Sequence, residues 1–435
     1  MMPQYPDSSF YRFDYLLLKD GWLQPAFVGV DKEGVVQYLS SEKPATPAAI
    51  EAVAGAALPG FQNAHSHAFQ FGMAGKAEIH DKGATDDFWT WREAMYTCAL
   101  AYNPTELKSV AVQLYRQMLR NGYTQVAEFH YLHHDKDGKP YANLAETGER
   151  LVEAAAEAGI KITLIPVFYQ KGDFGKAPHA QQRRFISRDT DAYFKLMESS
   201  KRAISRYHNA SLGFGVHSLR AVDAAAIVAT YANGPKDLPF HVHAAEQLKE
   251  VEACVAYLGQ RPVEWLLNNL EVGPGFNLVH CTHMTSEETK RIAQSGATVI
   301  LCPGTEANLG DGIFPLADYS QHKGAWAIGT DSQISLNPLE DLRWLDYAQR
   351  LSTHKRNTFH NGAAHMVCNS ILNGRKAMGE NTEDYFAVGK ALDAAVYDLA
   401  WPALAQADAA YLLPAIVYTA DSSALLGTMV NGKWV

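Results

Sequence analysis

Cysteine is scarce in this sequence: its 435 residues include only five, spread so widely that no two form a Cys-x-x-Cys pair. This usage argues against a disulfide framework and favours a reducing compartment. The chain also lacks an apolar run of roughly 18 residues, the length that a membrane span needs. Its first residues, MMPQYPDSSF, have neither the basic nor the apolar region of a signal peptide. We therefore expect a cytoplasmic protein that does not associate with membranes.

Positive charge is in deficit as well. Lys and Arg together number 38 against 47 Asp and Glu, which gives a net charge of -9 with His neutral. A chain this acidic has no general attraction for nucleic acid, so an anionic ligand has to be bound by a few local cations. Hydrophobic residues make up 47% of the chain, enough for a large core. The composition thus favours a globular protein that binds a small acidic molecule and no nucleic acid.

Strand-like and helix-like segments alternate along most of the chain. The strand-like segments are nearly continuous apolar runs, as expected for buried parallel strands, and helical patterns that end on glycine lie between several of them. The eight candidates span residues 58–67, 123–131, 161–169, 211–218, 238–246, 276–283, 297–305 and 325–332. No GxGxxG motif follows the first strand, so the pattern indicates a closed (β/α)8 barrel of the TIM type rather than an open doubly wound sheet.

The two chain ends have a different texture. Short β-type runs separated by turns occupy residues 10–40, and a similar pattern returns near the C-terminus, where Asn431-Gly432 is a hairpin signal. Neither end has enough strands to bury a sheet alone. We expect the ends to form one small β-sandwich domain from residues 1–58 and 386–435, beside an α/β barrel of residues 59–385.

Imidazole and carboxylate side chains gather at the ends of three strands. His65 and His67 end the first strand, His243 ends the fifth and Asp331 ends the eighth. Carboxyl ends of barrel strands meet at one mouth, and three imidazoles with one carboxylate form a donor set suited to zinc, although Fe2+ and Mn2+ also fit. His241 shares a strand face with His243 but lies deeper, so we expect it in the core or directly behind the ligands and take His243 as the ligand.

Two further groups fit acid-base roles at this mouth. Glu246 follows the fifth strand, where a carboxylate can move a proton between water and substrate; a carboxylate favoured by the helix dipole is the plainer explanation. His280 near the end of the sixth strand is our candidate for orienting or deprotonating the water, with His283 as its competitor. Asp331 completes the predicted catalytic set.

Cations at the mouth bear on the substrate. Arg92 and Arg220 lie just beyond the first and fourth strands, and arginines there suit bidentate binding of carboxylates. Arg183 and Arg184 are additional anion-binding candidates. The histidines of the segment FHYLHHDKDG (130, 133 and 134) precede a turn, so we expect them to be solvated rather than to form a second metal site.

Several motifs together resemble a known family. They include HSHAFQ, HVHAAEQLKEVEACVAYLGQRPVEWLL, LVHCTHM and CPGTEANLGDGIFP. The chain resembles the formimidoylglutamate deiminases of the amidohydrolase superfamily. Members of that superfamily with two metal ions typically use a carboxylated lysine on the fourth strand. This chain has no lysine there, so the resemblance implies a single metal ion. It departs from the motifs of that family at Phe71, Gly304 and Gln333.

The resemblance implies hydrolytic deimination of N-formimidoyl-L-glutamate in histidine degradation, with zinc and a homodimeric assembly. It carries substrate contacts onto five residues: Gln70, Arg92, Tyr131, His217 and Arg220. The alternatives are a nucleobase or pterin deaminase on the same scaffold, and a non-catalytic metal-binding barrel. The long segment of residues 76–103 is the candidate for a loop that closes over the substrate.

Overall fold

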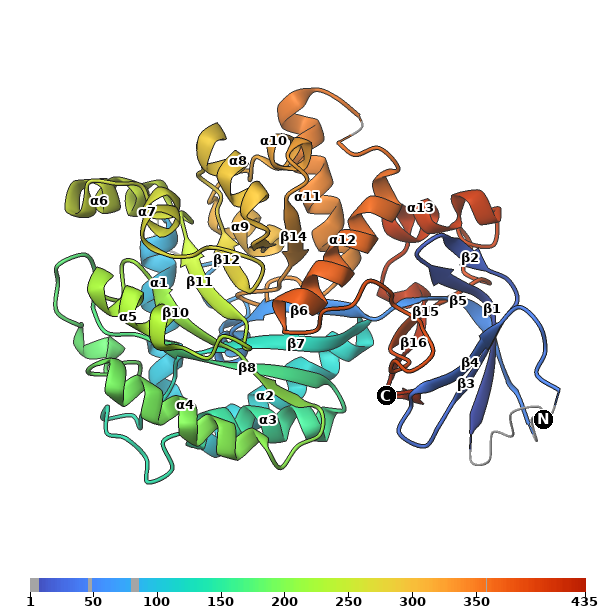
Figure 1. The fold of residues 1–435 in the computed structure, drawn as a ribbon, viewed down its shortest axis with the longest axis horizontal. Coiled ribbons are helices and arrows are strands. Elements are labelled where there is room, and N and C mark those ends of the chain that lie inside the picture. Colours follow the sequence, from blue (N-terminus) through green and yellow to red (C-terminus); the bar gives the residue numbers. More distant parts are fainter. Residues whose placement is uncertain (1–7, 46–48, 80–85, 357) are drawn as a thin grey trace.

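Eight parallel strands form a nearly closed barrel surrounded by helices (Figure 1). The computed structural model describes residues 8–45, 49–79, 86–356 and 358–435. Neighbouring barrel strands follow the order β14-β13-β12-β11-β10-β8-β7-β6, and a short strand, β9 (Ala210–Leu212), pairs with β8. The barrel strands are β6 (Phe61–Ser66), β7 (Tyr123–His130), β8 (Lys161–Phe168), β10 (Phe214–Ser218), β11 (Phe240–Ala244), β12 (Phe276–His280), β13 (Thr298–Leu301) and β14 (Ala325–Ile328). Each of the eight predicted strand segments contains one of them, so the predicted barrel is confirmed.

The barrel closes where the first and last strands meet. The Asp331 amide donates to the His65 carbonyl at 3.0 Å, and the His67 amide donates to the Asp331 carbonyl at 3.2 Å. These two bonds join residues that are far apart in the sequence. They also bring three of the four predicted metal ligands to one point of the rim.

The outer helices begin and end at the signals that the sequence carries. Asn103 caps α2 (Pro104–Arg120): its side chain accepts from the Glu106 amide, and the Glu106 side chain accepts from the Asn103 amide. Left-handed glycines end α3 (Glu146–Ala158), α6 (Leu248–Leu258) and α8 (Ser286–Ser295). The other α-helices between the first and last barrel strands are α1 (Phe88–Ala101), α4 (Thr190–Ile204), α5 (Ala224–Asn233), α7 (Pro262–Asn269), α9 (Pro303–Leu309) and α10 (Leu316–Gln321).

Strands from both chain ends build a second sheet beside the barrel (Figure 1). Its order is β17-β16-β15-β5-β1-β3-β4, with β2 paired to β1. The C-terminal strand β15 pairs antiparallel with β5, which confirms that the two ends fold together. The strands are β1 (Ser9–Leu18), β2 (Gly21–Leu23), β3 (Ala26–Val30), β4 (Val36–Ser40), β5 (Glu51–Pro59), β15 (Ala394–Asp398), β16 (Leu425–Val430) and β17 (Lys433–Trp434).

The two sheets are joined directly at Gly60, between β5 and β6. A Cβ atom at this position would lie 2.2 Å from the Thr124 side chain, so only glycine permits the close approach of this link to β7. The connection fixes the start of the strand that ends in His65.

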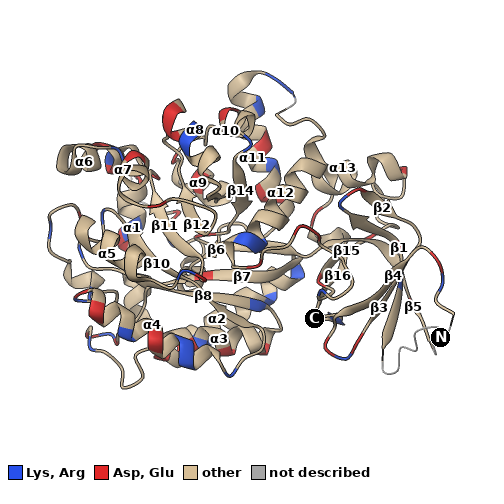
Figure 2. Ribbon diagram, viewed as in Figure 1, with Lys and Arg blue, Asp and Glu red and all other residues tan. Residues whose placement is uncertain are grey.

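Three helices follow the last barrel strand: α11 (Pro338–Thr353), α12 (Gly362–Ala377) and α13 (Ala409–Thr419). The helix α12 packs against β14 and β6, and α13 packs against α11 through a bond of 2.8 Å from the Tyr418 hydroxyl to Asp346. Acidic and basic residues are interspersed on the outer helices (Figure 2). None of the described helices has both the length and the hydropathy to cross a membrane.

Candidate active site

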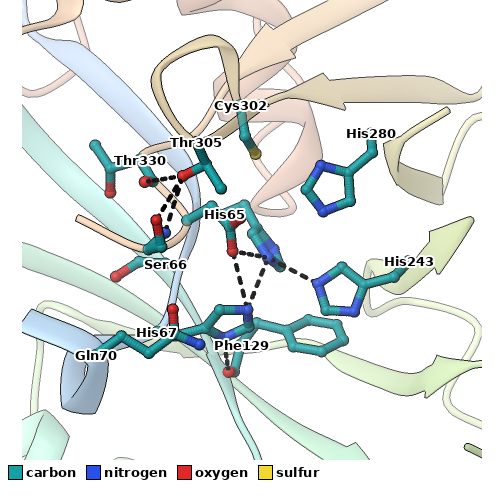
Figure 3. Close-up of polar contacts among 12 residues, drawn as sticks. His65, Ser66, His67, Gln70, Phe129, His243, His280, Cys302, Thr305 and Thr330 are labelled. Carbon is teal, nitrogen blue, oxygen red and sulfur yellow. Dashed lines mark hydrogen bonds and ion pairs between the residues drawn. The ribbon is translucent and has the colours of Figure 1, made fainter. Parts of the chain in front are cut away.

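Four donor atoms converge at the carboxyl ends of β6, β11 and β14 (Figure 3). The Nε2 atom of His65 lies 3.2 Å from Nε2 of His67 and 3.0 Å from Nε2 of His243. Asp331 Oδ1 lies 3.4 Å from Nε2 of His65 and 3.1 Å from Nε2 of His67. Ligands about 2.0–2.1 Å from a tetrahedral zinc ion are roughly 3.3 Å apart. The spacing of the four donors is therefore that of a metal site.

For two of the three histidines, the partner of the other ring nitrogen shows that the donor atom presents a lone pair. His67 Nδ1 bonds the Phe129 carbonyl at 2.9 Å, and His243 Nδ1 bonds the His217 carbonyl at 3.0 Å. A carbonyl only accepts, so each Nδ1 carries the proton and each neutral ring has an unprotonated Nε2. Facing lone pairs beside a carboxylate repel one another unless a cation lies between them. The residues present therefore fit a divalent metal ion.

Burial favours the neutral imidazoles that metal binding requires. It lowers the pKa of His65 to about 3 and holds the pKa of His243 well below its usual value. Burial alone would raise the pKa of Asp331, but the neighbouring imidazoles of His65 and His67 hold it well below its usual range. At neutral pH the cluster combines the neutral imidazoles of His65 and His243 with an anionic carboxylate, the protonation states of metal ligands.

The backbone adopts unusual conformations at the strand ends that carry these groups. Ala245, His280 and Asp331 have φ values of 52°, 71° and 48°. Such values are uncommon for residues other than glycine and are often found at functional sites. Here they turn the chain sharply out of β11, β12 and β14, and the turns coincide with the side chains that line the mouth.

Glu246 and His280 lie beside the metal cluster. Glu246 Oε1 is 3.9 Å from His280 Nε2, and Glu306 Oε1 is 3.4 Å from His280 Nδ1. Burial raises the pKa of Glu246 to about 7. Burial would by itself lower the pKa of His280, but the carboxylates of Glu246, Glu306 and Asp331 raise it to about 10. A carboxyl group with a pKa near neutrality suits proton transfer at physiological pH.

The cluster opens into a narrow cavity with polar and aromatic walls. All five predicted substrate contacts line it, as do Glu246, His280 and three of the four proposed ligands; His65 lies beneath them. Gln70 Nε2 donates to the Tyr131 hydroxyl at 3.1 Å, which leaves Gln70 Oε1 buried with no partner among the described residues. The helix α1, from the predicted closing segment of residues 76–103, forms one wall, while residues 80–85 lie outside the described part of the chain.

Two of the cavity-lining residues are arginines that form no ion pair or hydrogen bond with any described residue. Arg220 is only 5% exposed, and its Nη1 atom is buried without a partner; the same is true of Nε of Arg92. Aromatic rings flank both guanidinium groups, with Arg92 4.3 Å from the Trp89 ring centre and Arg220 5.6 Å from that of Phe88. Cationic donors held this way in a cavity are suited to anionic ligands.

Arg183 and Arg184 lie outside this cavity and bond main-chain carbonyls instead. Arg183 donates to Lys136 and Ala180, whereas the fully buried Arg184 donates to Ala99, Tyr102 and His134. Their guanidinium groups tie loops and the end of α1 together. This arrangement gives them a structural role in place of the anion binding that the sequence suggested.

The expectation that the three histidines before the Asp-Lys-Asp-Gly turn are solvated was wrong. His130 and His133 are buried, and His134 is half-buried. His130 contacts the Thr147 hydroxyl at 3.0 Å, while the other two contact main-chain carbonyls. The turn itself is exposed, but the chain before it folds inward over the end of β7.

His241 and His283, the histidines that compete with His243 and His280 for roles in the site, both lie away from the cavity. His241 is in the barrel floor, where its Nε2 contacts the Ala377 carbonyl at 2.8 Å. His283 is half-buried beside Gly312, whereas His280 faces the cavity. Three residues depart from the motifs of the formimidoylglutamate deiminases. Phe71 and Gln333 line a small side cavity behind Gln70, and Gly304 packs against Asp341.

Sequence reasoning missed two buried glutamates that support the site. Glu128 accepts from the Ala68 amide at 2.6 Å and from the Ser66 hydroxyl at 3.0 Å, so it fixes the chain around His67. Glu306 binds His280 as described above. Glu128 lies within the apolar strand β7 and Glu306 lies in the first turn of α9. A carboxylate at either position could not be told from a surface residue by local sequence alone.

The chain belongs to the amidohydrolase family, whose sequence model matches residues 56–435. It is 42% identical over 425 residues to the formimidoylglutamate deiminase of Pseudomonas aeruginosa, which covers 96% of this chain and 92% of that protein. The 8-oxoguanine deaminase of the same organism is 26% identical over 341 residues, covering 74% of this chain and 71% of that protein. The resemblance inferred from the motifs is thereby confirmed.

Solved structures agree with this assignment. An amidohydrolase from Brucella melitensis has a TM-score of 0.89 at 38% identity, covering 98% of this chain and 94% of that one. A zinc-bound adenosine deaminase from Xanthomonas campestris has a TM-score of 0.82 at 20% identity, covering 99% and 93%. At that identity the second match shows a shared fold alone.

Proposed function

We propose that this protein hydrolyses N-formimidoyl-L-glutamate to N-formyl-L-glutamate and ammonia, a reaction of histidine degradation. The observation that carries the proposal is a metal-type donor cluster in the same cavity as two arginines without acidic partners among the described residues. The first part suits hydrolysis of a C–N bond, and the second suits a substrate with two carboxylates. The 42% identity to a formimidoylglutamate deiminase supports the same reaction.

His65, His67, His243 and Asp331 would hold the metal ion, and we propose zinc because imidazole and carboxylate donors at this spacing suit it. When bound, such an ion supplies an activated water, because it lowers the pKa of that water to about 7. The remaining chemistry falls to side chains of the cavity.

Glu246 is the proposed proton donor to the imino nitrogen, since burial places its pKa near neutrality. His280 and Asp331 orient the attacking water, Asp331 accepts its proton, and Glu306 holds His280 in place at 3.4 Å. The formimidoyl carbon gains an oxygen and loses ammonia.

Substrate recognition follows from the unpaired groups of the cavity wall. Arg220 and Arg92 bind the two carboxylates, and the unpartnered Gln70 Oε1 accepts from an N–H of the substrate. Tyr131 supports Gln70 through its hydroxyl, and His217 completes the wall next to Arg220.

A nucleobase or pterin deaminase is the second candidate, because aromatic side chains including Trp91, Tyr96 and Tyr169 line the same cavity. A neutral heterocycle, however, would leave both arginines buried without an anion. A barrel that only binds metal would have no use for Glu246 and His280 beside the ligands, since structural zinc sites are closed.

The test is ammonia release by the zinc-loaded protein from N-formimidoyl-L-glutamate, with N-formimidoyl-L-aspartate and guanine as comparison substrates. We expect turnover that is selective for the glutamate compound. Turnover of guanine, with none of the glutamate compound by a fully metallated protein, would refute the proposal in favour of the second candidate.

We further propose a homodimer in the cytoplasm, which rests on the resemblance and on the cysteine usage rather than on the fold. Light scattering of the purified protein tests the assembly. A mass of one chain, 47.9 kDa, would contradict it.

A further inference from the structure

A second group of possible metal donors adjoins the first. His280, Cys302 and Asp331 end three neighbouring strands, and one donor atom from each lies within 4.8 Å of the other two. All three residues are buried, and Cys302 is fully buried. Figure 3 shows the sulfur of Cys302 turned toward the imidazole of His280. The proposed reaction uses no thiol, so this sulfur is unexplained by it.

The contacts already made leave suitable atoms for a second ion. Asp331 uses Oδ1 toward His65 and His67, and no described residue bonds its Oδ2. His280 Nδ1 faces Glu306, which leaves Nε2 on the side of Glu246. The Cys302 sulfur has no hydrogen-bond partner among the described residues, although its amide donates to Glu306.

The geometry points to an inhibitory site for a soft divalent cation, and we propose that Cys302, His280 and Asp331 bind a second ion such as Cd2+ or excess Zn2+. Tetrahedral donors to one ion lie roughly 3.3–3.8 Å apart, so shifts of about 1 Å close the three around it. A thiolate and an imidazole select zinc-like or softer ions over Mg2+ or Ca2+. Glu246 Oε1 lies 3.9 Å from His280 Nε2 and would supply a fourth donor. Coordination releases two protons to solvent, one from the Cys302 thiol and one from the His280 imidazolium.

Such an ion would block turnover by occupying His280 and Asp331, both of which the proposed reaction needs. The inhibition therefore rests on the proposed function, whereas the binding does not. Because His280 and Asp331 line the cavity, a cation reaches them by the same route as the substrate.

The experiment is a titration of the holoenzyme, carrying one zinc per chain, with CdCl2. Cadmium and zinc are counted by mass spectrometry after dialysis, the thiolate-to-cadmium charge-transfer band is followed in the ultraviolet, and ammonia release is measured in parallel. We expect one cadmium beside the retained zinc, a thiolate band that saturates at one equivalent, and loss of turnover over the same range. Cadmium that only displaces zinc, or binds without a thiolate band, would overturn the proposal.

Two variants, Cys302→Ser and Cys302→Ala, locate the thiol. Both should keep the basal activity, lose the band, and weaken cadmium inhibition by about 100-fold or more. Cys254→Ser is the matched control, because Cys254 is equally buried but lies in α6 outside the cluster; it should behave like the parent. Equal cadmium sensitivity of the Cys302 variants and the parent would refute the assignment.

If neither Cys302 variant folds, His280→Asn tests the site through the spectrum alone, and an unchanged cadmium midpoint would refute the site. The spectrum and the metal count also separate the two proposals. A thiolate band in a protein that is inactive on formimidoylglutamate would reject the proposed function and leave the second metal site standing.

Discussion

Two buried arginines differ in what their charge is expected to do. We propose that Arg220 binds the substrate, whereas Arg184 holds parts of the fold together. Arg220 is 5% exposed and bonds none of the described residues, whereas Arg184 is fully buried and donates to three main-chain carbonyls. Replacing each by Met removes the charge and keeps much of the apolar volume. We expect opposite consequences for activity and stability.

For Arg220→Met we predict loss of kcat/KM with little loss of stability. Removing one partner of a buried charge pair costs about 2–5 kcal/mol, or roughly 30-fold to several-thousand-fold in kcat/KM. The folded protein without substrate loses no hydrogen bond to a described residue, so its free energy of unfolding should change by less than about 1 kcal/mol. The favourable electrostatic contributions that are removed are the attraction to Glu246 and Glu250 and the contacts with the rings of Phe88 and Trp89.

For Arg184→Met we predict a large loss of stability with little loss of kcat/KM. The carbonyls of Ala99, Tyr102 and His134 lose their donors, and each buried unsatisfied group costs about 1–3 kcal/mol. A loss of about 3–5 kcal/mol is therefore expected, with kcat/KM largely kept in the fraction that remains folded. Guanidinium denaturation and ammonia release, measured on zinc-loaded proteins, give both quantities.

Substrate analogues sharpen the test of Arg220. An analogue that lacks the carboxylate that we propose Arg220 binds should be turned over slowly by the parent, and equally slowly by Arg220→Met. The reasoning would be refuted if kcat/KM for the full substrate were unchanged in Arg220→Met. It would also be refuted if this variant lost as much stability as Arg184→Met.

Three further predictions concern the catalytic centre. Glu246→Gln should keep fold and metal content but lower kcat about 100- to 10,000-fold. Because Glu246 acts in its protonated form with a pKa of about 7, the parent profile should have a limb that falls above pH 7, beside the rising limb of the metal-activated water, and this falling limb should be absent from Glu246→Gln. A Glu246→Gln profile that keeps the falling limb would contradict this role. His243→Ala should lose the metal on dialysis, as measured by mass spectrometry, and a fully metallated variant would remove His243 from the ligand set. Glu306→Gln should lower kcat about 10- to 100-fold with little change in KM and a shifted pH profile, because it weakens the contact that orients His280; an unshifted profile would argue for a purely structural role.

Local patterns in the sequence were sufficient to predict the barrel and its rim. Apolar runs and capping residues report on neighbours a few positions away, so strands, helix ends and the strand-end placement of His65, His67, His243 and Asp331 could all be inferred. The choice of His243 over His241 followed from depth along one strand. The structure places the two as that reasoning expected, with His241 against the Ala377 carbonyl.

Tertiary structure alone decided which polar groups have partners. Arg220 and Arg184 look alike in the sequence, yet one faces a cavity and the other is tied to carbonyls of α1 and of the loops around it. The burial of His133 and the contact between Glu306 and His280 likewise depend on segments brought together from different parts of the chain. The sequence by itself determined which residue types stand at the strand ends, because periodicity is local. Whether a charge there is satisfied, and so whether it serves the fold or a ligand, is set by long-range packing.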